Sequence, residues 1–243
     1  QHVARYLQPR FSAEIARKPS SPYSDKLTPK QIKIILNRSI VQSERYRTMK
    51  AAGYSEEEIK AAFRKKQEMT VFTYHGDIDT LMSPLDSIRY YKSFLRSGFM
   101  SMDPKTGAVK AYVGGLDYPH FMYDMVSLGR RQVGSTIKPF LYSLAMSNGF
   151  QPCDLAPNRQ QTYMVAGRPW TPRNANHSRA GQMVPLSWGL AQSSNWVSAY
   201  LMSKLNPQQF VQMLRDFGIN SPDIHASMSL CLGPCEVSVS EMV

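Results

Sequence analysis

The chain has 243 residues, 42% of them hydrophobic, and its 29 lysines and arginines against 18 aspartates and glutamates give a formal net charge of +11. This length and composition suit a globular chain with one large core or two smaller ones, and no low-complexity segment or internal repeat is present. No apolar stretch approaches the roughly 20 residues that span a bilayer.

The basic excess lies mostly in the first hundred residues. Residues 1–100 carry 18 lysines and arginines against 10 aspartates and glutamates, whereas residues 101–243 carry 11 against 8. Such an excess can attract nucleic acid, an anionic membrane or a cell-wall polymer. The cluster Arg64–Lys66, however, ends a predicted helix, where cations complement the helix dipole. We therefore expect a solvated helix end here and no nucleic-acid site.

The first part of the chain combines predicted helices with a predicted strand. Thr28-Pro29 opens an apolar-periodic helix that extends through Leu36, and Ser55 with Glu58 begins a charged helix that extends to Lys66. Residues 69–74 are predicted to form a strand. Residues 1–95 therefore form a predicted linker or pedestal region ahead of a second domain at residues 96–243.

The second part begins with a predicted hairpin and continues with helices. Residues 99–102 and 108–113 are two predicted strands, and Lys105-Thr-Gly107 supplies the turn between them. The segment from Ser135 to Phe217 is predicted to be mainly helical. The expected helices are one that begins near Ser135 and stops at Asn148-Gly149, a short one opened by Pro185, one over residues 196–205, and one between Asn206-Pro207 and Gly218 whose side chains Phe210, Leu214 and Phe217 belong to the core.

Ser135 and Lys138 place a hydroxyl and an amine three residues apart at the start of a predicted helix. Side chains at this spacing share one helical face and can touch. A serine hydroxyl needs a base to become nucleophilic, and a partly buried lysine with a lowered pKa can provide it. The helix N-terminus also favours an oxyanion beside Ser135. The pair is a candidate nucleophile and base, although Ser-x-x-Lys is also a common solvated helix face.

A second polar group, Ser193-x-Asn195, follows the short helix opened by Pro185 and precedes the apolar run of residues 196–205. At a junction between two helices, the serine and asparagine side chains can point out of the core. The same residue types are common in ordinary polar turns and caps. This motif alone leaves both interpretations open.

Taken together, these motifs resemble the penicillin-binding proteins. Arg131–Phe140 and Leu190–Asn195 resemble the family's first two motifs, Asp103–Gly115 resembles the hairpin that precedes the nucleophile in transpeptidase domains of the bifunctional, class A type, and Trp170–Asn174 resembles the loop between the motifs. The resemblance covers residues 96–243. It implies an α+β penicillin-binding and serine β-lactamase-like transpeptidase fold, in which helices flank an antiparallel sheet and a helical subdomain carries Ser193-x-Asn195.

The resemblance also implies a reaction and a role for each residue. Ser135 would attack the carbonyl between the two D-alanines of a peptidoglycan stem peptide, with Lys138 as the favoured base. Ser193 would pass a proton to the leaving amine, and Asn195 would hold the substrate amide and Lys138. Further expected substrate contacts are Gly134, Trp170 and Asn174.

The expected partners are stem peptides, β-lactam antibiotics and other cell-wall synthesis proteins, with no cofactor. The family further implies a location on the periplasmic face of the bacterial inner membrane, with a membrane anchor outside this chain and a glycosyltransferase domain upstream. Glycosyltransferase motifs are not visible in the sequence, so that domain is implied by the resemblance alone.

The family's third motif, Lys-Thr-Gly on a strand edge, is expected beyond Ser193-x-Asn195. Lys105-Thr-Gly107 precedes Ser135 and fits a hairpin turn, so it is not the catalytic motif. We therefore expect the fold to be incomplete here, the chain to stop before this motif, and the isolated segment to be inactive.

Two alternative functions stay open. One is a D,D-carboxypeptidase or β-lactamase-type hydrolase, which usually needs a glutamate to activate water. No convincing counterpart is present, although Glu236 and Glu241 stay open. The other is a non-catalytic penicillin-sensing or scaffold module.

The cysteines and histidines do not predict a metal site. Cys153, Cys231 and Cys235 form no Cys-x-x-Cys unit, and the five histidines lack ligand spacing. A Cys153–Cys231 disulfide and buried free thiols are both compatible with the sequence.

Overall fold

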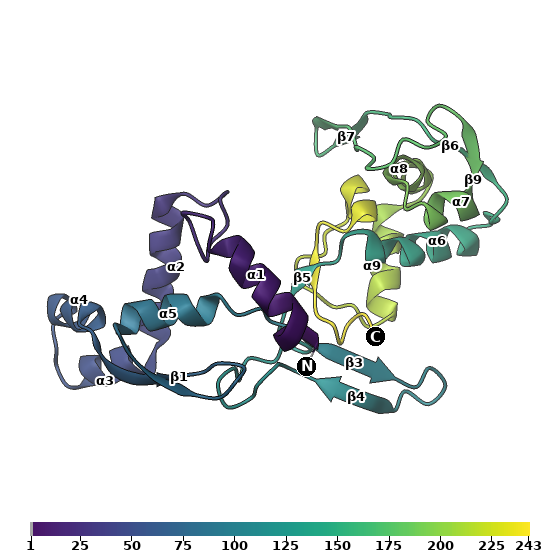
Figure 1. The fold of residues 1–243 in the computed structure, drawn as a ribbon. Helices are drawn as coiled ribbons and strands as arrows, with labels where there is room; N and C mark the ends of the chain where they lie inside the picture. The colour runs from purple at the N-terminus through teal and green to yellow at the C-terminus, as the bar shows by residue number, and fades with distance from the viewer. Residues whose placement is uncertain (1) are drawn as a thin grey trace. The chain divides into compact units, whose positions relative to one another are not determined.

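The computed structural model describes residues 2–243, which divide into two compact units between Arg96 and Ser97 (Figure 1). Both units mix helices with short strands, and every strand pair is antiparallel. The predicted α+β class is therefore confirmed. None of the helices in the described part of the chain is both long and apolar enough to cross a membrane.

The first unit consists of helices around one hairpin. Its helices are α1 (Gln8–Ile15), which follows a π-helical stretch at Val3–Leu7, α2 (Pro29–Gln42), α3 (Glu44–Ala51), α4 (Glu56–Arg64) and α5 (Pro84–Lys92). Its hairpin pairs β1 (Gln67–Val71) with β2 (Ile78–Met82).

Both predicted helices of this unit have a side chain that caps the N-terminus. Thr28 and Ser55 each accept a hydrogen bond from the third helical residue, and the side chains of Gln31 and Glu58 bond back to the capping residues. These capping boxes satisfy N–H groups that have no partner within the helix. Both helices are confirmed, although α2 continues past Leu36 to Gln42 and α4 ends at Arg64 instead of Lys66.

The strand predicted at residues 69–74 is wrong in its second half. The strand β1 ends at Val71, because Thr73 and Gly76 exchange backbone hydrogen bonds of 3.2 and 3.1 Å and close a turn. Beyond the hairpin, the buried amide of Gln8 ties α1 to the segment after α5. It donates to the carbonyl of Ser93 and accepts from the N–H of Leu95.

The second unit begins with the predicted hairpin of β3 (Phe99–Met102) and β4 (Val109–Val113). In the turn, the Asp103 carboxylate accepts hydrogen bonds from the N–H groups of Lys105 and Thr106 at 2.9 and 3.0 Å. Lys105-Thr-Gly107 is therefore a hairpin turn, as predicted.

The rest of this unit is helical at both ends and extended in the middle. Its helices are the 3₁₀ turn Gly134–Ile137, α6 (Lys138–Ser147), α7 (Leu186–Ala191), α8 (Asn195–Ser203), α9 (Pro207–Asp216) and a second 3₁₀ turn at Met228–Leu232. Its strand pairs are β5 (Arg131–Gln132) with β10 (Glu236–Val237), β6 (Leu155–Pro157) with β9 (Met183–Pro185), and β7 (Tyr163–Val165) with β8 (Arg168–Trp170).

The prediction of a mainly helical segment is wrong between Asn148 and Pro185. This stretch forms β6 to β9 and contains no helix. Prolines at 152, 157, 169, 172 and 185 each remove a backbone N–H donor, and a proline in a helix interior also clashes with the preceding turn. The chain therefore pairs in short extended pieces here.

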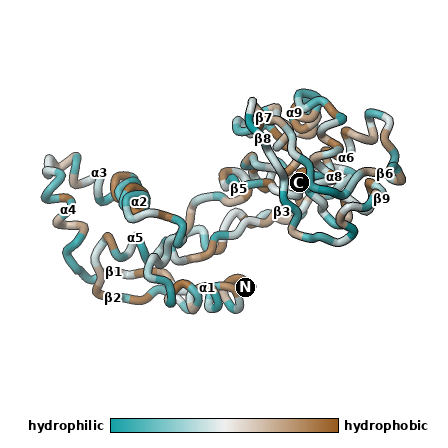
Figure 2. Tube along the Cα trace, turned by 90° about the horizontal axis from the view of Figure 1, so that it is seen from above, coloured by the Kyte–Doolittle hydropathy of each residue, from teal (hydrophilic) through white to brown (hydrophobic). Residues whose placement is uncertain are grey.

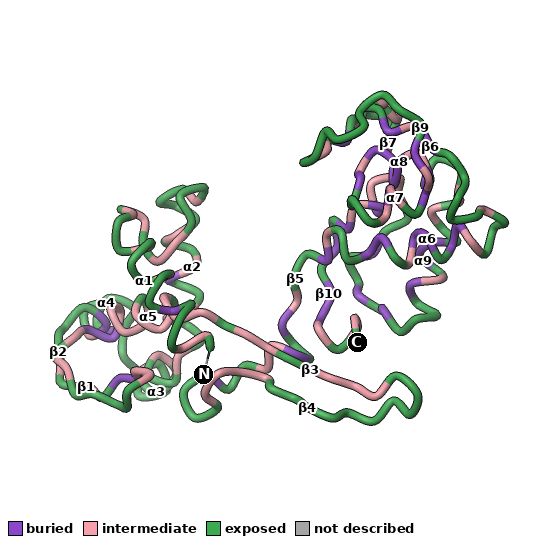
Figure 3. The backbone as a smooth tube through the Cα atoms, turned by 45° about the vertical axis from the view of Figure 1, so that its right-hand side comes forward, coloured by how far each residue is buried: buried purple, intermediate pink, exposed green. Residues whose placement is uncertain are grey.

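The core of the second unit gathers on α6, α8 and α9, where Figure 3 shows buried positions along the chain. Phe210 and Leu214 are fully buried, as predicted. The prediction that Phe217 belongs to the core is wrong, because this residue follows the last turn of α9 and is 58% exposed. Its ring lies edge-on to Phe140, with ring centroids 5.3 Å apart.

We expect Phe210→Ala to lower the free energy of unfolding by about 3–5 kcal/mol, because it removes a fully buried ring and leaves a cavity. Phe217→Ala is the matched control at the C-terminus of the same helix and should cost less than about 1.5 kcal/mol, the contribution of one exposed aromatic pair. Denaturant unfolding of the two variants measures the difference. Equal losses would contradict this assignment of the core.

Candidate functional site

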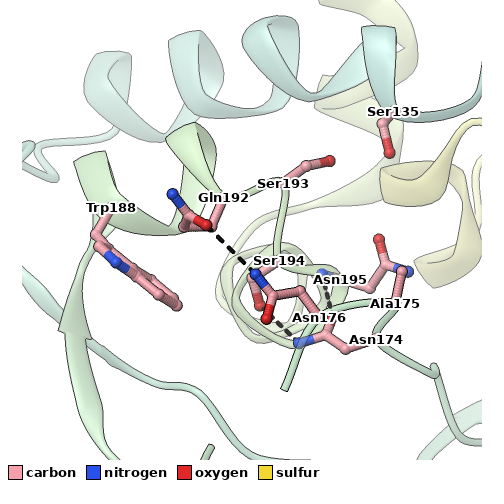
Figure 4. A pocket seen from close by; sticks show the side chains of 9 residues that line it. All are labelled: Ser135, Asn174, Ala175, Asn176, Trp188, Gln192, Ser193, Ser194 and Asn195. Carbon is pink, nitrogen blue, oxygen red and sulfur yellow. Dashed lines mark hydrogen bonds between the residues drawn. The ribbon is translucent and has the colours of Figure 1, made fainter. Parts of the chain in front are cut away.

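The second unit contains a cavity of about 160 Å³ between the start of α6 and the junction of α7 with α8. Its lining consists of Ser135, Asn174, Ala175, Asn176, Trp188, Gln192, Ser193, Ser194 and Asn195 (Figure 4). Figure 4 shows the Ser193 hydroxyl pointing toward Ser135. The fold thus brings Ser135 beside Ser193 and Asn195, which are remote from it in sequence.

Ser135 lies in the 3₁₀ turn that leads into α6, where a helix start was predicted. Pro139 occupies the first turn of α6, a position where the missing N–H costs no hydrogen bond. Ser135 is exposed, while Ile137 and Lys138 beside it are buried. The turn therefore presents the serine at the surface and anchors itself through its neighbours.

A backbone contact with the later segment Gly233–Val237 supports this turn. The N–H of Gly134 donates to the carbonyl of Gly233 at 3.0 Å, and that of Val133 donates to Cys235 at 2.9 Å. A Cβ on Gly233 would collide with the carbonyl oxygen of Gly134 and lie 2.7 Å from its nitrogen. Gly134, an expected substrate contact, lies outside the cavity lining and commits its N–H to this bond.

Lys138 is a buried cation with neutral partners. Its side chain is among the largest that are fully buried. The Nζ atom donates to the carbonyl of Ser193 at 2.6 Å, to the Ser193 hydroxyl at 3.0 Å and to Asn195 Oδ1 at 2.7 Å. The left-handed backbone of Ser193 (φ 53°), which is unfavourable for most residues, turns two oxygens of one residue toward the amine.

Burial lowers the pKa of Lys138 to about 8. Desolvation disfavours the charged form of a lysine, and the ion pairs among the described residues do not include Lys138. A substantial fraction of this amine is therefore neutral near pH 8, as a base must be.

A direct hydrogen bond between Ser135 and Lys138 is absent among the described residues. The three donors of the protonated amine all go to Ser193 and Asn195. That the Ser135 and Lys138 side chains can touch stays a prediction from helical spacing. The Ser193 hydroxyl bonds Lys138 and points toward Ser135.

A buried polar network that sequence analysis missed holds the Ser193–Asn195 turn. The hydroxyl of Ser194 accepts from the N–H of Val197 and from Asn174 Nδ2, and it donates to Asn158 Oδ1 at 3.0 Å. Asn174 Oδ1 accepts from the N–H of Asn195 at 2.6 Å. Ser194 directly precedes an apolar helix, which is the usual signal of a helix cap. Asn158 has no such local signal.

One tryptophan, Trp188, lines the cavity. Trp170, an expected substrate contact, does not line the cavity, and its ring centroid lies 6.1 Å from that of Tyr163. Trp188 and Gln192 line the cavity instead. Of the residues that line it, none is acidic, and neither Glu236 nor Glu241 is among them.

The three cysteines are free thiols in the structure, with Cys153 exposed and the other two buried. Burial raises the pKa of Cys231 to about 12, so this thiol stays protonated at neutral pH and is a poor nucleophile. Among residues 2–243, no cluster of three or more histidine, cysteine, aspartate or glutamate side chains could hold a metal ion.

Comparison with known families places this fold and site in a class. Residues 97–227 match the model of the penicillin-binding protein transpeptidase domain, and residues 18–95 match that of the penicillin-binding protein middle domain. The transpeptidase match covers more than half of the chain. The chain belongs to the penicillin-binding transpeptidase family.

The chain is similar to several named penicillin-binding proteins. It is 34% identical over 147 residues to Penicillin-binding protein 1A of Neisseria flavescens, a match that covers 59% of this chain and 18% of the relative. It is 35% identical over 153 residues to Penicillin-binding protein 2D of Bacillus subtilis, covering 62% and 22%. The chain thus spans about a fifth of the length of these relatives.

A solved structure agrees on the fold. The crystal structure of Penicillin-Binding Protein 1A from Haemophilus influenzae aligns with a TM-score of 0.57 and 24% identity, covering 71% of this chain and 24% of that one. This likeness supports the transpeptidase fold that the sequence resemblance implied.

Gly233 offers a test of how the Ser135 turn is held. We expect Gly233→Ala to lower the free energy of unfolding by about 1–3 kcal/mol more than Gly149→Ala does. Both glycines have positive φ, 63° and 91°, so both variants carry the backbone strain, but only Gly233 has atoms in the way of a Cβ. Thermal unfolding compares them, and equal effects would show that the close approach to Gly134 is not tight.

Proposed function

We propose that this chain contributes the serine acyl-enzyme site of a peptidoglycan D,D-transpeptidase. One observation carries the proposal. The buried Lys138 amine bonds Ser193 and Asn195 at 2.6 to 3.0 Å, and these two residues line a cavity together with Ser135. A desolvated amine, a hydroxyl relay and an exposed serine at a helix start are the groups that nucleophilic acyl transfer needs.

The first half of the reaction forms an ester. The Ser135 oxygen bonds to the carbonyl carbon between two D-alanines, and its proton goes to the neutral Lys138 amine through the Ser193 hydroxyl. The carbon–nitrogen bond to the terminal D-alanine then breaks, and the leaving amine takes the proton back through Ser193. The stem peptide is left as an ester on Ser135.

The second half resolves the ester. The amine of a neighbouring stem peptide attacks the ester carbonyl, loses a proton to the Lys138–Ser193 pair and forms the amide crosslink, and Ser135 regains its proton. Asn195 holds Lys138 in place through its Oδ1 atom. Because none of the residues that line the cavity is acidic, a water-activating glutamate has no support here, which favours an amine acceptor over hydrolysis.

The proposal also covers β-lactam ligands, the roles of the two parts of the chain and the cellular location of the site. A β-lactam carbonyl acylates Ser135 in place of the stem peptide. Residues 1–95 serve as a linker or pedestal, and residues 96–243 supply the N-terminal part of the transpeptidase domain. The site works on the periplasmic face of the inner membrane, as part of a bifunctional synthase that carries a glycosyltransferase and contacts other cell-wall synthesis proteins.

Ser135→Ala should abolish covalent labelling by penicillin, because it removes the exposed hydroxyl toward which the Ser193 relay points. Intact-mass detection of a penicilloyl adduct, on protein expressed from its complete reading frame, measures this. Ser143→Ala is the matched control, since Ser143 is an exposed serine of α6 that bonds only the carbonyl of Pro139. An adduct that persists in Ser135→Ala would refute the nucleophile.

The acylation rate should depend on pH through Lys138. The neutral amine is the base, so the rate should rise about tenfold per pH unit up to the pKa of about 8 and level off above it. Stopped-flow acylation by a chromogenic β-lactam between mildly acidic and mildly alkaline pH measures the profile. Lys138→Ala should lower the rate by several orders of magnitude and remove this dependence. A flat profile in the unmodified protein would exclude Lys138 as the base.

A further inference from the structure

The first unit contains a groove of about 990 Å³ between α2, α4 and α5, far larger than the cavity beside Ser135. Its floor includes the buried side chains of Leu36 and Phe63. Ile32 and Ile40, each four residues from Leu36, are half-buried and continue the apolar stripe along α2. At 1.5 Å per residue, this stripe is about 12 Å long.

Cations surround this apolar floor. Lys33, Lys60 and Arg64 line the groove and are exposed, and none of the ion pairs among the described residues includes them. A fourth cation, Arg89, pairs with Asp86 at 3.0 Å. The groove lining contains no aspartate or glutamate. Figure 2 shows hydrophobic and hydrophilic residues interspersed along α2.

We propose that this groove binds an acidic amphipathic helix of a partner protein. Apolar side chains on one face of that helix fill the stripe of Ile32, Leu36 and Ile40, and carboxylates on its flanks meet Lys33, Lys60 and Arg64. Helices bind grooves through apolar residues on successive turns, and a stripe of two turns on α2 offers the matching contacts.

The shape and polarity of the groove favour this occupant over others with negative charge. A lipid headgroup surface is flat and leaves a concave apolar floor unfilled, and a nucleic-acid backbone needs polar donors where Leu36 and Phe63 lie. The proposal does not depend on the reaction at Ser135, because every residue that it uses belongs to the first unit.

Synthetic peptides can test the proposal on the purified protein. The probe is a fluorescent helix of about 18 residues with leucines on one face and glutamates elsewhere. One control peptide replaces each glutamate with lysine, and another replaces each leucine with serine. We expect the glutamate peptide to bind with a Kd on the order of 10 μM and both controls to bind at least about tenfold more weakly. Equal binding of the glutamate and lysine peptides, or no binding, would overturn the proposal.

Charge reversal then locates the site. Lys33→Glu with Lys60→Glu should weaken binding of the glutamate peptide at least about tenfold. The control pair Lys105→Glu with Lys110→Glu changes the net charge equally on the exposed hairpin of the second unit and should leave binding unchanged. Thermal unfolding verifies that both variants are folded. Equal losses in the two pairs would mean non-specific attraction and would overturn the proposal.

Two further measurements test whether a membrane surface or a second copy of this chain occupies the groove instead. Sedimentation of the protein with phosphatidylglycerol vesicles tests a membrane. Vesicle binding that is lost in Lys33→Glu with Lys60→Glu, without any peptide binding, would replace the helix with a lipid surface. Analytical ultracentrifugation tests a second copy of this chain, and self-association that the same variant abolishes would likewise overturn the proposal.

Discussion

The hydrogen bonds of the Lys138 amine are the constraint on which the site depends. They join the first residue of α6 to a turn that lies 55 to 57 residues later in the chain. A buried ammonium without partners is very costly, so the fold keeps this turn against α6. This turn also depends on Ser194, Asn174 and Asn158. The Ser194 hydroxyl hydrogen-bonds both asparagines, and Asn174 accepts from the N–H of Asn195. The hydrogen bonds that position the proposed catalytic groups therefore also hold this turn against α6.

Ser135 itself is held from the opposite side. Backbone hydrogen bonds from Val133 and Gly134 to Cys235 and Gly233 fix the turn ahead of α6, and Gly233 permits the close approach because it lacks a Cβ. The proposed nucleophile is thus held by two contacts of different kinds. Side chains position Lys138 and Ser193, whereas main-chain contacts position Ser135. A rigid frame of this sort is what a preorganised site requires.

Local signals in the sequence predicted the local features well. The caps at Thr28 and Ser55 and the hairpin turn at Asp103 depend on residues within a few positions of one another, so their chemistry is visible in the sequence. The strand pairs between Asn148 and Pro185 and the role of Asn158 depend on contacts across the fold, which no periodicity encodes. Ser135 and Lys138 were found by spacing, but the partners of Lys138 came from a remote motif, and only the family resemblance linked the two.

Because the partners of Lys138 are neutral, its charge also determines the sign of the electrostatic potential in the cavity. The buried Lys138 cation bonds a hydroxyl, a carbonyl and an amide of Ser193 and Asn195, which line the cavity, and none of the described residues in that lining is acidic to cancel its charge. In a desolvated pocket, an uncompensated charge acts at longer range than it does in water. A protonated Lys138 therefore makes the electrostatic potential in this cavity positive, which favours negatively charged groups over positively charged ones. In the proposed reaction the same amine must lose its proton, and the positive potential is present only while the amine holds that proton.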